Sequence, residues 1–226
     1  MNIGGFQKLS LKDYPGNVSS IIYTIGCNFR CGFCHNPDLI TSNKIISEDQ
    51  ILNFLEERKD MLDAVVITGG EPTLQKDLKD FLEKIKDLDL KVKIFTNGSN
   101  PDIIKDLLHS RLVDSVSMDY KCPLDSYHSF VDFKDIEKIK ETRDFLIEYD
   151  GDYEFRITLI EELFNDGILE QLAKELKPAK KIILQKFRND IVLDEEFKKF
   201  KNTSDKYMMN AKETMEKIVD KKIYIS

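Results

Sequence analysis

The chain has 226 residues, of which 41% are hydrophobic and 33% charged, a composition typical of a globular protein and not of a disordered one. Its formal net charge of −7 argues against a general nucleic-acid binder, because such a protein usually presents a basic face. The longest apolar run, residues 18–25, is too short to span a bilayer, and the N-terminus lacks the pattern of a secretory signal, so we expect a cytoplasmic protein with no membrane partner.

Short segments rich in β-branched residues predict six strands. In chain order they are residues 19–25, 64–68, 92–96, 114–118, 153–159 and 181–185. Residues 222–226 are expected to add a strand at the edge of the sheet.

Helical patterns alternate with these strands. Residues 47–50 (SEDQ) form a capping box, and Asn100 precedes a proline suited to the first position of a helix. Apolar residues repeat at helical spacing from Leu78, and further helices are expected at about 133–149, 163–176 and 205–219. The alternation predicts an α/β fold with parallel strands and right-handed crossovers, either a partial barrel or an open doubly wound sheet.

No internal repeat or Gly/Ser linker marks a second domain. We therefore expect one domain over residues 1–226. Its core would cover about 17–188, and residues 189–226 would form a helical C-terminal extension.

Polar, glycine and cysteine residues follow four consecutive predicted strands. In parallel α/β sheets, ligands bind at the carboxyl ends of the strands. Those ends carry the cysteine loop 27–34, GGEP at 69–72, TNG at 96–98 and MDYK at 118–121. This convergence predicts one shared site.

Three of the four cysteines, Cys27, Cys31 and Cys34, lie within eight residues. In a cytoplasmic protein, such cysteines are more often metal ligands or catalysts than disulfides. Thiolates are the usual ligands of iron–sulfur clusters, so three of them indicate a cluster with one iron open to a substrate or cofactor. The alternative is a closed zinc or cluster site, completed by Cys122 or His35.

The C-x3-C-x2-C spacing, with Phe33 before the last cysteine, resembles the signature of the radical S-adenosylmethionine (SAM) superfamily. The GGEP sequence about 35 residues further on resembles the superfamily's SAM-contacting motif. The resemblance implies a partial (β/α)6 barrel of parallel strands. It also implies that Cys27, Cys31 and Cys34 bind a [4Fe–4S] cluster whose open iron is chelated by SAM.

Finer features resemble the glycyl-radical enzyme activating enzymes. They are the CHN continuation at 34–36, TNG at 96–98, and Asp119 with Lys121. In that family the lysine reaches the methionyl carboxylate of SAM, and a cation there would hold the carboxylate in its chelating pose. Stretches at 5–16, 119–124 and 184–188 resemble one branch, the activating proteins of anaerobic ribonucleoside-triphosphate reductase.

The resemblance implies that Lys121 acts with the three cysteines in catalysis and that further residues surround SAM. These residues are Phe33, Cys34, His35, Gly69, Gly70, Glu71, Pro72, Thr96, Asn97, Met118, Asp119, Lys121, Arg156, Gln185 and Phe187. For the aromatic rings and Gln185 the alternative is a place in the core. Arg156 would bind the SAM carboxylate or pair with an acidic residue, since arginine is seldom buried alone.

The sequence leaves open whether a monovalent cation binds beside SAM. Phe95 stands where the pyruvate formate-lyase activator type has an acidic ligand for a monovalent cation, although Met118 and Asp119 match the rest of that cation site. Cys122 is expected to be a thiol without a role in the site.

Together these features predict a radical SAM oxidoreductase. It would take one electron from a flavodoxin or ferredoxin, cleave SAM to methionine and a 5′-deoxyadenosyl radical, and generate a glycyl radical on a partner enzyme. One alternative is a small-molecule radical SAM enzyme of the 7-carboxy-7-deazaguanine synthase type. A non-enzymatic alternative is an iron–sulfur electron carrier or a zinc-bound scaffold.

Overall fold

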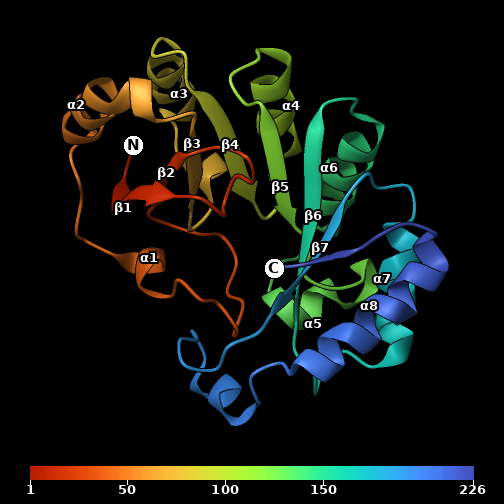
Figure 1. Ribbon diagram of the computed structural model, residues 1–226. Coiled ribbons are helices and arrows are strands. Elements are labelled where there is room, and N and C mark those ends of the chain that lie inside the picture. The colour runs from red at the N-terminus through yellow and green to blue at the C-terminus, as the bar shows by residue number, and fades with distance from the viewer. The chain divides into compact units, whose positions relative to one another are not determined.

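The computed structural model describes residues 1–226 with the exception of Ser129. The strands are β1 (Ile3–Ser10), β2 (Ser19–Thr24), β3 (Ala64–Gly69), β4 (Lys91–Thr96), β5 (Ser115–Asp119), β6 (Asp152–Leu159), β7 (Ile182–Lys186) and β8 (Tyr224–Ile225) (Figure 1). The α-helices are α1 (Asp38–Thr41), α2 (Glu48–Arg58), α3 (Leu78–Lys86), α4 (Pro101–His109), α5 (Tyr127–Val131), α6 (Ile136–Glu148), α7 (Asp166–Glu175) and α8 (Asp205–Val219). The predicted α/β class is confirmed.

The chain forms two compact units. The first comprises residues 1–28 and 38–117, and the second comprises residues 29–37 and 118–226. The division runs through the cysteine loop, so Cys27 belongs to the first unit whereas Cys31 and Cys34 belong to the second.

In the first unit, β2, β3 and β4 are parallel neighbours, as predicted. The residues of β3 from Ala64 to Ile67 are fully buried, because a parallel strand is covered on both faces. Strand β1 was missed. It pairs antiparallel with β2 through two register irregularities, and its glycines and polar residues disguise the usual strand pattern.

Helices α2, α3 and α4 of the first unit begin where the sequence indicates, but the two expected caps act differently, and α1 was not expected. Ser47 and Asn100 stand at the N-cap positions of α2 and α4, yet within the described residues neither side chain makes a capping hydrogen bond. The Asn100 amide instead donates to Thr73 Oγ1 at 2.8 Å. Asn100, which was expected to cap α4, therefore links the loop before α4 to the loop after β3.

In the second unit, β6, β7 and β8 are parallel neighbours, and the predicted C-terminal edge strand is confirmed as a two-residue β8. Helices α7 and α8 lie side by side (Figure 1). Asn165 caps α7 and Ser204 caps α8, each accepting a backbone N–H. Among the described residues, none of the helices has both the length and the apolar character needed to cross a membrane.

Candidate functional site

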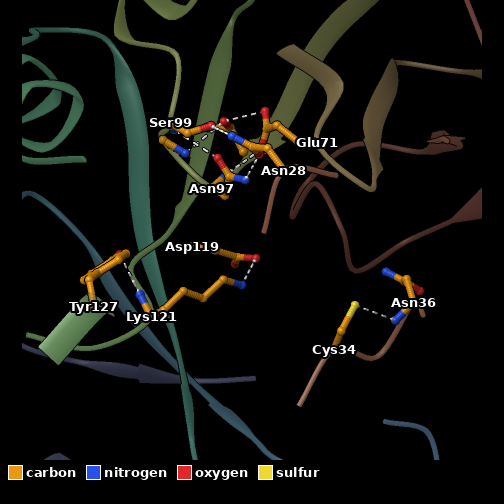
Figure 2. Close-up of polar contacts among 11 residues, drawn as sticks. Asn28, Cys34, Asn36, Glu71, Asn97, Ser99, Asp119, Lys121 and Tyr127 are labelled. Carbon is orange, nitrogen blue, oxygen red and sulfur yellow. Dashed lines mark hydrogen bonds and ion pairs between the residues drawn. The ribbon is translucent and has the colours of Figure 1, made fainter. Parts of the chain in front are cut away.

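The cysteine loop contributes thiols to both units. In the second unit, Cys34 N–H donates to the Cys31 carbonyl at 3.0 Å, which closes a tight turn, and the Asn36 N–H points to Cys34 Sγ at 3.4 Å (Figure 2). Within the described residues the cysteines form no disulfide, and no group of three or more His, Cys, Asp or Glu side chains makes a metal site. Ligation of a cluster by Cys27, Cys31 and Cys34 therefore stays a prediction.

The two glycines of GGEP pack backbone against backbone in the first unit. Gly70 N–H donates to the Thr24 carbonyl at 2.9 Å. A Cβ on Gly70 would lie 1.9 Å from the Gly26 carbonyl oxygen, and one on Gly69 would lie 2.4 Å from Thr24 N. Gly69 also has a φ of +115°, which favours glycine. These contacts hold the GGEP backbone against the residues that lead into Cys27.

The Glu71 carboxylate is fully buried, and both of its oxygens accept hydrogen bonds from groups of the same unit. Its Oε1 accepts from Thr73 N (3.1 Å), Thr73 Oγ1 (2.6 Å) and Thr96 Oγ1 (2.9 Å), and its Oε2 accepts from Asn97 N at 2.6 Å. Burial raises the pKa of Glu71, and these donors only partly offset that shift. A carboxylate accepts about four hydrogen bonds, so these four use the acceptor capacity of Glu71. Because the donors come from Thr73, Thr96 and Asn97, the side chain links the GGEP and TNG loops.

A closed ring of hydrogen bonds ties the residue after Cys27 to the TNG loop (Figure 2). The Asn97 amide donates to Asn28 Oδ1 at 2.9 Å, the Asn28 amide donates to Ser99 Oγ at 2.8 Å, and Ser99 N–H donates to Asn97 Oδ1 at 2.9 Å. Asn28 and Ser99 were missed by the sequence reading. The only available signal was a polar residue directly after the first cysteine.

In the second unit, Lys121 lies between an acidic and an aromatic partner. Its ammonium is 2.8 Å from Asp119 Oδ2 (Figure 2). It also lies 5.9 Å from the centroid of the Phe33 ring. Burial opposes the charge of Lys121, but the carboxylate of Asp119 and negative charge on Cys31 and Cys34 outweigh it, so the pKa of Lys121 is raised. The lysine side chain is only 15% exposed, which excludes a simple solvated ion pair.

The backbone of Lys121 is held by a residue that the sequence reading missed. Lys121 N–H donates to the hydroxyl of the fully buried Tyr127 at 3.0 Å (Figure 2). Tyr120 N–H donates to the Arg156 carbonyl at 2.8 Å, and the Tyr120 hydroxyl donates to Glu175 Oε2 at 2.6 Å. The loop after β5 is therefore fixed by β6, α5 and α7.

The other predicted residues of the second unit lie mostly in the interior. Phe33, Met118 and Phe187 are at most 3% exposed. The His35 ring stacks on Phe187 at 6.0 Å, and its Nε2 lies 3.2 Å from the Arg188 carbonyl oxygen. Gln185 is half-buried in β7.

These features suit a cluster and SAM. The donor set contains three thiols in one short loop, the usual ligand type for iron–sulfur clusters. The backbone of Gly69 and Gly70 packs against Thr24 and Gly26, and Gly26 directly precedes the first thiol. Lys121 provides a cation close to the other two.

Comparison with known proteins shows similarity over most of the chain. Residues 21–170 match the family model described as the radical SAM superfamily. A protein of Methanocaldococcus jannaschii, named as a candidate glycyl-radical enzyme activating enzyme, is 32% identical over 225 residues. That match covers 96% of this chain and 93% of the relative.

Two solved structures share the fold. Streptococcus suis SuiB bound to S-adenosylmethionine superposes with a TM-score of 0.69 at 15% identity, and the match covers 91% of this chain and 49% of SuiB. A domain of pyruvate-formate lyase-activating enzyme from Bacteroides vulgatus gives a TM-score of 0.59 at 20% identity, covering 72% of this chain and 98% of that domain. The chain spans about half the length of SuiB.

Proposed function

The chain belongs to the radical SAM superfamily, and from this premise we propose that it is a glycyl-radical enzyme activating enzyme. The observation that carries the proposal is the 32% identity to a relative of that name over 96% of the chain. The match covers nearly the whole relative as well, so it is not confined to a shared SAM-binding core. We take the two units to act together as one radical SAM domain.

Cys27, Cys31 and Cys34 are assigned as the ligands of a [4Fe–4S] cluster, which leaves one iron for SAM. When bound, the cluster would supply the electron for reductive cleavage of SAM into methionine and a 5′-deoxyadenosyl radical, and this radical would remove a hydrogen atom from a glycine Cα. The protein's contribution is to bind the cluster and SAM, to orient SAM, and to exclude water from the site.

In the first unit, the GGEP backbone is assigned to the amino group of SAM. Carbonyl oxygens of Gly69 and Gly70 are suitable acceptors, because Glu71 already accepts from Thr73, Thr96 and Asn97. Glu71 is therefore a positioning residue. Pro72 begins the 3-10 turn Pro72–Leu74, in which the Glu71 side chain accepts the Thr73 N–H, and so helps to fix the same loop.

In the second unit, Lys121 is assigned to the SAM carboxylate. Its raised pKa keeps the ammonium charged, and a charged hydrogen bond in a site of low polarity is strong. Phe33, Met118 and Phe187 supply apolar surface that excludes water, while His35, Arg156 and Gln185 are proposed for the remaining polar contacts of SAM.

A monovalent cation would compete with Lys121 for Asp119. The two side chains already pair at 2.8 Å. We therefore expect equal rates of SAM cleavage in sodium, potassium and tetramethylammonium buffers, and a strict requirement for sodium or potassium would contradict this expectation.

The partner is proposed to be an anaerobic ribonucleoside-triphosphate reductase in the cytoplasm. The stretches at 5–16, 119–124 and 184–188 support this branch by resemblance. A flavodoxin or ferredoxin is proposed as the electron donor, because the cluster needs one electron for each SAM cleaved.

The proposal is tested with anaerobically reconstituted protein, SAM and dithionite. The expected product is 5′-deoxyadenosine, and its formation should be limited by the amount of added glycyl-radical enzyme when the reductant is flavodoxin. Cleavage that instead follows the consumption of a small molecule would refute the protein substrate. No cleavage at all would refute SAM chemistry at this site.

A further inference from the structure

A segment of the C-terminal extension returns to the cysteine loop within the second unit. The Gly32 carbonyl, between Cys31 and Cys34, accepts the N–H groups of Leu193 (3.1 Å) and Asp194 (3.0 Å). A carbonyl oxygen has two lone pairs, so both of its acceptor positions are used. The peptide between the two cysteines is thus bound to a segment about 160 residues further along the chain.

The same segment places an aromatic ring directly on Gly32. A Cβ on Gly32 would lie 2.2 Å from Phe197 Cε2 and 2.6 Å from Cδ2. The Phe197 ring therefore occupies the space that any side chain at position 32 would need. Its centroid is also 6.0 Å from that of Phe33 and 6.5 Å from that of Phe187.

The segment that carries Phe197 is fastened at both ends. At one end, Asp194 accepts the Glu196 N–H at 3.0 Å and so starts the turn Glu195–Lys199. At the other end, Thr203 N–H donates to the Phe187 carbonyl at 3.1 Å, and its hydroxyl donates to the Leu159 carbonyl at 2.6 Å. Phe197 is therefore held in one place by hydrogen bonds outside its own ring contacts.

We propose that Phe197 is a positioning residue for the Cys31–Cys34 turn. Its ring closes the solvent side of Gly32 and sets the place of Phe33, next to which the ammonium of Lys121 lies. This inference rests on the proposed role of Cys31 and Cys34 as cluster ligands. The half-buried ring of Phe197 covers a turn whose own residues Gly32 and Phe33 are buried.

Removal of the ring opens the turn to water and frees its peptide to move. Phe197 makes two aromatic contacts with the rings nearest the turn, and both favour the closed turn. Loss of these contacts should make local opening of the turn more frequent. Release of cluster iron should therefore be about tenfold faster in Phe197→Ala than in the wild type.

The experiment measures iron release from anaerobically reconstituted, dithionite-reduced protein to an excess of the ferrous chelator bathophenanthroline. Phe197→Leu should recover part of the loss, because leucine fills part of the same space. The matched control is Phe145→Ala, since Phe145 is also half-buried in the second unit but stacks on Tyr149, at 6.1 Å. The control should release iron at the wild-type rate.

A second variant tests the contact itself. Gly32→Ala should displace the Phe197 ring and accelerate iron release in the wild-type background. In the Phe197→Ala background the same change should have little further effect, because the clashing ring is gone. The EPR spectrum of the reduced cluster with SAM should change in both single variants, which a remote loss of stability would not produce.

Several outcomes overturn the inference. They are an unchanged rate in Phe197→Ala, or effects of Gly32→Ala and Phe197→Ala that multiply as independent changes. Should Phe197→Ala fail to fold, Phe197→Leu and Gly32→Ala carry the same comparison. A wild-type protein that takes up no cluster would refute the proposed function, which is a separate failure.

Discussion

The two units hold their parts of the predicted site by different forces. In the first unit, Glu71, Asn97 and Asn28 are joined by short directional hydrogen bonds. In the second unit, the ammonium of Lys121 lies against Asp119 and the Phe33 ring, and aromatic rings surround the cysteine turn. The first arrangement depends on where donors and acceptors stand, whereas the second depends on charge and shape.

This difference has a physical consequence for substitutions. A buried acceptor replaced by a donor leaves several groups unpaired at once, and each costs about 1–3 kcal/mol. A packed ring or a buried cation tolerates a substitute of similar size or charge better. The first-unit part should therefore be sensitive to single-atom changes, and the second-unit part should respond to volume and charge.

The largest effect is expected from the cysteines, which belong to both parts. Cys31→Ala should abolish cluster binding and 5′-deoxyadenosine formation, because two thiolates cannot hold the cluster in place of three. Iron content and product analysis check this result. Cys122→Ala is the matched control, since Cys122 is fully buried and burial raises the pKa of its thiol, and it should keep wild-type iron content. Loss of iron in the control would instead support a closed four-ligand site.

The next effect tests the directional network. Glu71→Gln changes one carboxylate oxygen into an amide donor that faces the donors of Thr73, Thr96 or Asn97. We expect SAM affinity to fall by about 10- to 100-fold, at about 1.4 kcal/mol for each factor of ten. Equilibrium binding to the reconstituted protein measures it.

A control and a contradiction accompany Glu71→Gln. Glu83→Gln, on the exposed face of α3, should leave SAM binding unchanged. Wild-type affinity in Glu71→Gln would mean that the network does not position the GGEP loop.

A smaller effect is expected from the cation of the second unit. Lys121→Met keeps most of the side-chain volume but removes the charge, so the KM for SAM should rise by about tenfold. Lys121→Arg should restore part of the affinity, because it keeps a cation beside Asp119. Steady-state rates over a range of SAM concentrations separate KM from kcat. Equal KM values for SAM in the Lys121→Met and Lys121→Arg variants would contradict a charge-based role.

The smallest effect is expected from the ring around Asn28. Asn28→Ala removes one acceptor for Asn97 and one donor to Ser99, and we expect SAM cleavage to slow by about three- to tenfold. Asn28→Asp should recover much of the rate, since the second carboxylate oxygen can accept from the Ser99 hydroxyl. The account of this ring would fail if the alanine variant cleaved SAM at the wild-type rate.

The elements that the sequence predicts well are those with a strong local pattern. Strands β3 and β4 were found from β-branched runs, and α8 was expected at about residues 205–219, where the structure has it. Strand β1 escaped because its pattern depends on pairing with β2 and not on its own residues.

The site shows the same limit. Cys27, Gly69 and Lys121 stand in short motifs and could be read from the chain. Asn28 and Phe197 could not, because their partners lie far away in sequence, at Asn97 and Gly32 respectively. Only the folded chain brings such residues together.

The most direct test of the central claim is EPR spectroscopy of the partner. Reconstituted protein, SAM and reductant are incubated with an anaerobic ribonucleoside-triphosphate reductase, once with unlabelled reductase and once with reductase that carries α-deuterated glycine. The account predicts a doublet on the partner that collapses towards a singlet with the deuterated glycine, because the splitting comes from the remaining α-hydrogen. SAM cleavage without any radical signal on the partner would contradict it.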